Sequence, residues 1–140
     1  MAFIQVSGDR QTEAFPKKAS TAIPSNNALI FESGFITVAA ATSTVIAGVS
    51  QRTIASTDAD YASATLTPIT MCDEEAVFEA DVVTGTLTTA MIGGRYDLAN
   101  ATGIDVTGTT YKPVTVVGFI SATKALVKFN GAYQTRDSAS

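Results

Sequence analysis

The residues that could do chemistry in this sequence are its acids. They gather in the middle of the chain on both sides of Cys72: Asp58, Asp60, Asp73, Glu74, Glu75, Glu79 and Asp81. Paired carboxylates can act as acid and base in glycoside hydrolysis, or can bind Ca²⁺. In a strand, Glu79 and Asp81 would lie on one face. Their spacing does not match a calcium-binding loop, and acidic edge strands resist aggregation. We therefore interpret them as solvated surface and predict no catalytic residue, metal site or cofactor.

The side chains that most catalytic sites need are missing. The sequence has no histidine, which removes the usual general base and the commonest metal ligand. Cys72 is the only cysteine, so it can form neither an intrachain disulfide nor a cysteine-based zinc site, and we interpret it as a small buried apolar group. These absences favour a protein that is not an enzyme. The enzymatic alternative is a hydrolase that uses acids alone, with Glu75 and Glu79 as the pair to test.

Length and charge limit the remaining classes. The chain has 140 residues, which suits one domain, and a net charge of -4. A mildly acidic chain without clustered Lys and Arg predicts no nucleic-acid partner. We expect no membrane partner either, because no apolar run approaches the length of a membrane span and residues 1–10 lack the pattern of a signal peptide.

The elements that must position these residues are predicted to be short strands, because β-branched residues are abundant. A hairpin is expected from residues 28–31 and 35–38, with a three-residue loop that ends at Gly34. One short helix is expected at residues 88–92, before two glycines. An exposed loop is expected at residues 99–110, either without regular structure or with a small hairpin. Further strands are expected at residues 45–49, 60–71 with a bend or edge at Pro68, 76–83, 95–98, 114–120 and 125–129.

The first 25 residues differ in pattern from the predicted strands of the rest of the chain. Pro16 and Pro24 favour extended backbone and no helical period appears, so residues 1–25 predict an extended arm. This arm is either a frayed terminus or a segment that orders on a partner. The predicted organisation is the arm, a β domain at residues 26–133 and a flexible tail at residues 134–140. The fold class is all-β: a small β-sandwich or barrel-like domain with an extended N-terminal arm and at most one short helix.

Three C-terminal segments carry a family resemblance. They are Ile-Gly-Gly-Arg-Tyr-Asp-Leu at residues 92–98, Val-Thr-Val-Val-Gly-Phe-Ile at residues 114–120 and Ala-Leu-Val-Lys-Phe-Asn at residues 125–130. Ile-Ala-Gly-Val at residues 46–49 adds a fourth. Over residues 28–133 this pattern of strands and glycines resembles the decoration proteins, or auxiliary head-stabilising proteins, of tailed-bacteriophage capsids.

The resemblance implies a structural virion protein that is made in the host cytoplasm. Such proteins bind the outside of the assembled shell, often as homotrimers, and bridge subunits of the major capsid protein. From its composition, the arm is expected to make the capsid contact through Phe3, Ile4, Val6, Arg10, Phe15, Lys17 and Lys18. The alternative is a head-fibre, tail or receptor-binding virion component that uses the loop at residues 99–110 for recognition.

Overall fold

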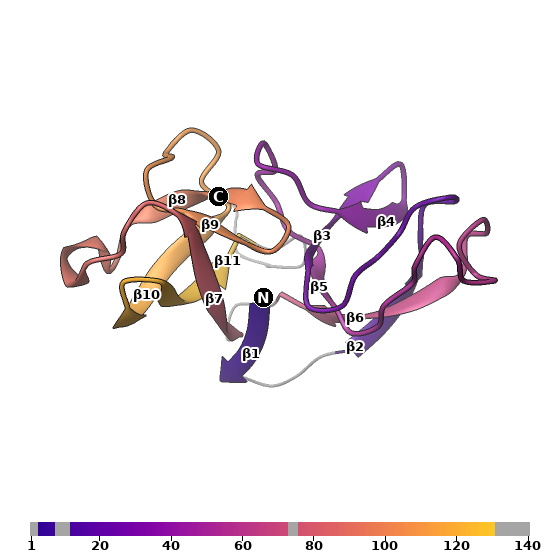
Figure 1. Ribbon diagram of the computed structural model, residues 1–140, viewed down its shortest axis with the longest axis horizontal. Coiled ribbons are helices and arrows are strands. Elements are labelled where there is room, and N and C mark those ends of the chain that lie inside the picture. Colours follow the sequence, from indigo (N-terminus) through magenta and orange to yellow (C-terminus); the bar gives the residue numbers. More distant parts are fainter. Residues whose placement is uncertain (1–2, 8–11, 73–75, 131–140) are drawn as a thin grey trace, which may run out of the picture.

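The computed structural model describes residues 3–7, 12–72 and 76–130. They form two β-sheets that lie side by side (Figure 1). The only helical element of these residues is one turn of 3₁₀-helix, η1 (Thr89–Met91). The predicted all-β, barrel-like fold with at most one short helix is therefore confirmed.

Eleven strands follow one another along the described part of the chain. They are β1 (Phe3–Ser7), β2 (Thr12–Pro16), β3 (Ala28–Glu32), β4 (Phe35–Val38), β5 (Gly48–Ser50), β6 (Leu66–Met71), β7 (Val77–Thr84), β8 (Arg95–Asn100), β9 (Gly103–Asp105), β10 (Val114–Ser121) and β11 (Lys124–Phe129).

The first sheet closes into a barrel. Its strand order is β1-β7-β11-β10-β8-β9, and an additional parallel pairing of β9 with β7 joins the two ends of the five strands β7 to β11. β1 lies outside this ring, antiparallel to β7. Successive side chains of β7 point to opposite faces, and Phe78, Ala80 and Val82 point into the core. Glu79 and Asp81 of β7 therefore face outward.

The second sheet has the order β2-β6-β5-β3-β4. It packs around its own apolar cluster, made of Ile23, Leu29, Ile36, Ala47, Ile54 and Ile69. The predicted hairpin is present as β3 and β4, but its loop is shorter than expected. Ser33 and Gly34 both have positive φ, 53° and 87°, which is the geometry of a two-residue hairpin turn.

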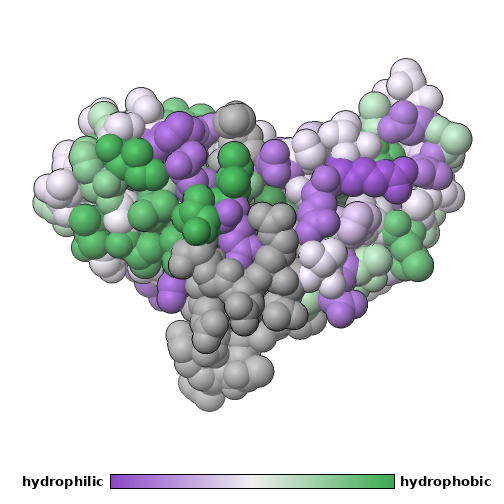
Figure 2. Space-filling model, turned by 90° about the horizontal axis from the view of Figure 1, so that it is seen from below, coloured by the Kyte–Doolittle hydropathy of each residue, from purple (hydrophilic) through white to green (hydrophobic). Residues whose placement is uncertain are grey.

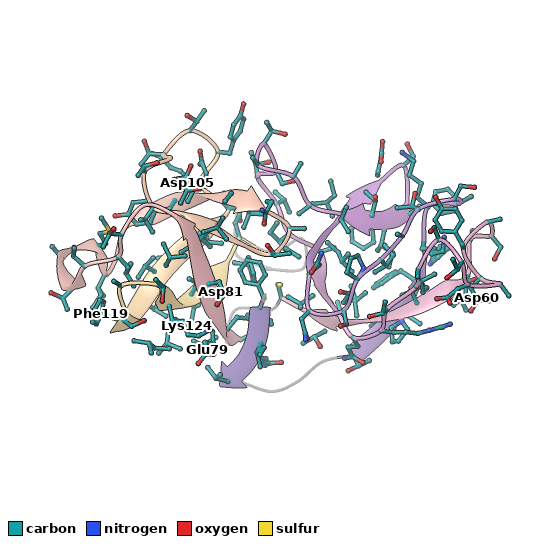
Figure 3. The ribbon with its side chains drawn as sticks, viewed as in Figure 1. Asp60, Glu79, Asp81, Asp105, Phe119 and Lys124 are labelled. Carbon is teal, nitrogen blue, oxygen red and sulfur yellow. The ribbon has the colours of Figure 1, made fainter. Side chains whose placement is uncertain are left out.

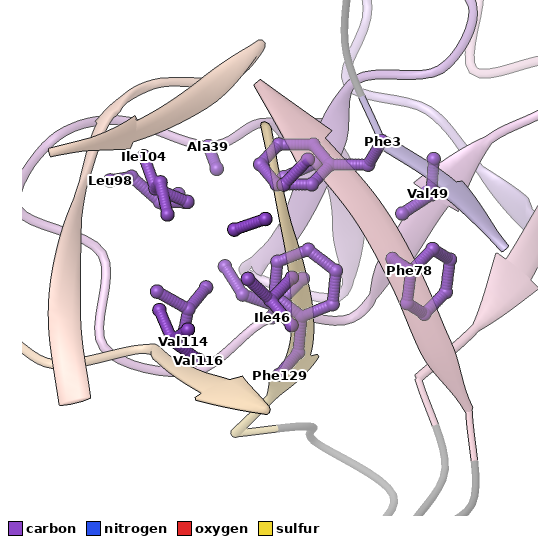
Figure 4. Close-up of a cluster of buried hydrophobic side chains, with 14 of the residues drawn as sticks. Phe3, Ala39, Ile46, Val49, Phe78, Leu98, Ile104, Val114, Val116 and Phe129 are labelled. Carbon is purple, nitrogen blue, oxygen red and sulfur yellow. The ribbon is translucent and has the colours of Figure 1, made fainter. Parts of the chain in front are cut away.

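A larger core joins the two sheets. Phe3, Phe78 and Phe129 of the first sheet share it with Ala28, Ile46 and Val49 from the second sheet and its connections (Figure 4). The Phe129 ring meets Phe3 and Phe78 edge-on, with ring centroids 5.0 and 5.1 Å apart. Backbone hydrogen bonds cross the same junction: the Ala28 N–H donates to the Ala101 carbonyl at 2.8 Å and the Ile46 N–H to the Asn130 carbonyl at 2.9 Å. The two sheets are therefore packed as one body.

The described part of residues 1–25 belongs to these sheets and is not a separate arm. β1 pairs with β7, and β2 pairs with β6. Phe3 and Ile23 are fully buried. The extended conformation was predictable from the prolines, but the pairing was not, because β1 and β7 are more than 70 positions apart in the sequence.

Other boundaries also differ from expectation. The stretch predicted as one strand from residue 60 begins only at Leu66, after a series of turns. There, the Ser63 and Thr65 hydroxyls bond each other at 2.8 Å, and the Ser63 N–H donates to the Asp60 carbonyl at 3.4 Å. Such local bonds compete with a strand ladder. By contrast, the exposed loop expected at residues 99–110 does contain a small hairpin, which β9 forms with β8.

The two faces of β1 give a direct test of its place in the fold. We expect Phe3→Ala to lower the free energy of unfolding by about 3–5 kcal/mol, since it empties a fully buried aromatic site. Ile4→Ala on the exposed face is the matched control and should cost less than about 1 kcal/mol. Urea unfolding at neutral pH measures both. Equal, small losses would mean that β1 is detached from the core.

Candidate functional site

The acids singled out in the sequence are engaged in surface structure. On the outer face of β7, Asp81 receives a hydrogen bond from the Lys124 ammonium at 2.7 Å, and Glu79 lies 3.8 Å from the same nitrogen (Figure 3). Asp60 is at the far end of the second sheet, where it pairs with Arg52 at 2.5 Å. Asp58 accepts the Ala55 N–H at 2.8 Å. These contacts give the acids a structural role.

Residues 73–75 fall outside the described part of the chain, so Glu75 cannot be placed beside Glu79. Within the described residues, no group of three or more His, Cys, Asp or Glu side chains is arranged to hold a metal ion. None of the described helical segments has the length and apolarity to cross a membrane. Cys72 is buried in the larger core, as its interpretation as a small apolar group predicted.

The six described residues among the seven predicted to contact a capsid are not brought together on one surface. Phe3 is in the shared core, and Phe15 packs edge-on against Phe31 in the second sheet, with ring centroids 5.1 Å apart. Ile4 and Val6 are exposed on β1, with 42% and 51% of their surface accessible. Arg10 lies outside the described residues.

The two lysines of the predicted contact differ sharply. Lys18 is exposed and pairs with Glu32 at 3.0 Å. Lys17 is fully buried: its ammonium donates to the carbonyls of Tyr61 at 2.6 Å and Lys18 at 3.1 Å, and lies 5.5 Å from the centre of the Tyr61 ring. Burial lowers the pKa of Lys17, and the charge of Asp60 opposes that shift. In this conformation Lys17 supports the fold and offers nothing to a partner.

The best candidate for a contact surface is a set of exposed apolar side chains on the barrel half of the molecule. We define the apolar surface as Ile4 and Val6 of β1 with Val117, Phe119 and Ile120 of β10. Two strands separate its two parts. Ile4 of β1 is opposite Glu79 of β7, Glu79 is opposite Leu126 of β11, and Leu126 is opposite Gly118 of β10. Figure 2 shows apolar side chains gathered over this half of the face on which it looks.

Irregular pairing exposes the β10 side chains. The register of β10 with β11 shifts between Val116 and Gly118 and again between Phe119 and Ser121, which leaves Val117 and Ile120 as extra residues. Bulges of this kind redirect side chains and increase the local twist. Val117, Phe119 and Ile120 are 39%, 39% and 44% exposed. Sequence reasoning found this strand but not its outward apolar groups, because the alternating pattern alone does not reveal a bulge.

A second surface feature is the loop that connects β9 to β10. Its backbone is held by Asp97, a β8 residue that is 7% exposed. The Asp97 carboxylate accepts N–H groups from Tyr111 at 2.7 Å, Lys112 at 2.8 Å and Thr110 at 3.2 Å. Burial alone raises the pKa of Asp97, but these three donors stabilise the charged form and bring the pKa below its ordinary value. These bonds anchor residues 110–112 of the loop to β8.

Sequence reasoning did not identify this role of Asp97. Its partners are 13 to 15 positions further along the chain, so the bonds depend on how β8 and β10 are placed by the barrel. The nearest signal in the sequence was the loop itself, rich in glycine and threonine and closed by Lys112-Pro113.

Comparison of the chain with models of protein families, with curated protein sequences and with solved structures finds no match in any of the three.

The anchoring carboxylate should make stability depend on pH. We expect Asp97→Asn to lower the free energy of unfolding at pH 7 by about 2 kcal/mol, because charge-assisted bonds to three backbone N–H groups are weakened. The folded-state pKa of Asp97 is lowered, so its stabilisation is complete above the unfolded value, about 3.9, and is lost as pH falls through the folded value.

The difference between the wild type and Asp97→Asn should therefore shrink below about pH 4. Thermal or urea unfolding from pH 7 to pH 2 measures this. Asp105→Asn is the control, because Asp105 is partly exposed and bonds Thr107 within its own turn. A difference that stays constant across the range would show that the charge of Asp97 is not what holds the loop.

Proposed function

We propose that this chain is a structural virion protein that binds the outside of an assembled phage capsid and bridges its subunits without catalysing a reaction. The observation that carries the proposal is the apolar surface on β1 and β10. Exposed apolar side chains that gather on one half of a molecule are typical of interaction sites. The resemblance of residues 92–98, 114–120 and 125–130 to decoration proteins supplies the partner, the major capsid protein.

The architecture supports a bridging role. The two sheets share one core, so a force applied at one sheet is carried to the other through packed side chains and not through a linker. If the chain assembles as a homotrimer, as the resemblance implies, three modest contacts act with a high effective concentration. A protein that binds only the assembled shell stabilises that shell by mass action.

The contact differs from the one expected of a free arm. Ile4 and Val6 remain in it as exposed residues of β1, whereas Phe3, Phe15 and Lys17 stabilise the fold. Removing residues 1–23 is therefore no test of binding, because it would remove Phe3 and Ile23 from the two cores. Substitutions on the exposed face test the contact without emptying the core.

We expect Ile4→Ser combined with Phe119→Ser to weaken binding to capsids that lack the protein by about thirtyfold. Each side chain loses about 1 kcal/mol of apolar burial, and about 2 kcal/mol corresponds to that factor. Leu66→Ser is the matched control, because Leu66 is 65% exposed but lies on the second sheet. Co-sedimentation with capsids gives the affinity, and thermal unfolding verifies that the variants are folded. Unchanged binding of the double variant would refute this contact.

The alternative function is that of a head-fibre, tail or receptor-binding component. The number of copies per particle distinguishes it from a decoration protein. Mass spectrometry of purified particles should find one copy per capsid subunit, or a simple fixed fraction of that number, if the protein covers the shell. A handful of copies per particle would favour the alternative, with the loop held by Asp97 as its recognition element. Absence from particles would refute both.

A further inference from the structure

The cations of the described residues are mostly neutralised within the chain. Lys18 pairs with Glu32, Arg52 with Asp60 and Lys124 with Asp81. Lys17 is buried against carbonyl groups. Arg95 and Lys112 are different. Both are exposed, and neither has a carboxylate of the described residues within ion-pair distance.

Arg95 and Lys112 occupy the same corner of the barrel. Arg95 begins β8 opposite Thr115 at the start of β10, and its Nη2 donates to the Lys112 carbonyl at 3.1 Å. Lys112 precedes the buried Pro113 and has a φ of 56°, in the left-handed region that a lysine rarely adopts. Tyr111, beside it, is 39% exposed. The structure thus holds two like charges and an aromatic ring at one end of the loop.

This arrangement is unfavourable for the isolated chain. A non-glycine residue kept at positive φ costs free energy, and such positions are concentrated at functional sites. The charge of Asp97 acts on Lys112, but its oxygens already accept three backbone N–H groups. Arg95 and Lys112 are therefore left to bind an anion from outside the chain.

We propose that Arg95, Tyr111 and Lys112 form a docking site for an acidic segment of a partner protein. A guanidinium binds carboxylates with two parallel hydrogen bonds, and a phenol hydroxyl can donate to the same group. Asp97 fixes the loop beforehand, so that binding loses little conformational entropy. A nucleic-acid backbone fits less well, because two cations on a chain of net charge -4 give little attraction for a row of phosphates.

The site is separate from the apolar surface and does not depend on the proposed function. Lys112 precedes the first residue of β10, whereas Phe119 and Ile120 are near its last. An eight-residue strand is about 25 Å long, so both surfaces can be occupied at once.

The test uses the full chain and a capped hexaglutamate peptide at low ionic strength, followed by NMR of the backbone amides. We expect the amides of residues 110–112 and of Arg95 to shift on titration. Arg95→Gln with Lys112→Gln should raise the peptide dissociation constant about fivefold. Lys18→Gln with Arg52→Gln removes the same charge from cations that are already paired, and should change the constant by less than about twofold.

Two results would overturn the proposal. Equal weakening in both double variants would mean that the peptide responds to net charge alone. Tighter binding of a single-stranded DNA oligonucleotide with the same number of charges would mean that the corner recognises phosphates and not a polypeptide. Thermal unfolding of each variant verifies that the loop and barrel remain folded.

Discussion

The rest of the structure depends on the edge-on packing of Phe129 between Phe3 and Phe78. These rings come from the last, first and seventh strands, so one contact joins residues from both ends and the middle of the chain. The same cluster contains Ala28, Ile46 and Val49, and it therefore fixes the second sheet against the barrel. Aromatic pairs of this geometry contribute about 0.5–1.5 kcal/mol beyond the area that they bury. A chain of this size needs such a shared core, because two separate small cores would each bury too little surface.

This inward packing determines what the surface presents. Side chains alternate along a strand, so burial of Phe3 turns Ile4 outward and burial of Phe78 turns Glu79 outward. The bulges in β10 interrupt that alternation and add Val117 and Ile120 to the exterior. The apolar surface is therefore a consequence of strand register on one side and of irregular register on the other.

The sequence predicted the fold class and most local elements, because these depend on neighbouring residues. The β3–β4 and β10–β11 hairpins, the turn of helix before Gly93 and the buried Cys72 all follow from short patterns. What was missed depends on distant pairing. The residues of β1 and β2 were predicted to form an arm, because prolines and polar residues occur both in extended arms and in edge strands. Lys17 was predicted to contact a partner, because the carbonyl that its ammonium binds is 44 positions away in the sequence. Asp97 gave no signal of its role for the same reason.

Lys17 and Asp97 show how buried charges can make this surface rigid. An unpaired buried charge would destabilise the fold by several kcal/mol, so each must hold its hydrogen-bond partners in place. Asp97 holds three consecutive N–H groups of the β9–β10 loop, and Lys17 holds the carbonyl of Tyr61 in the segment before β6. Loops are usually mobile, and a partner that binds them must then order them. Here Asp97 and Lys17 anchor these segments within the folded chain, one in each half of the molecule. A protein that works as a rigid connector between neighbours requires this property more than it requires any single contact.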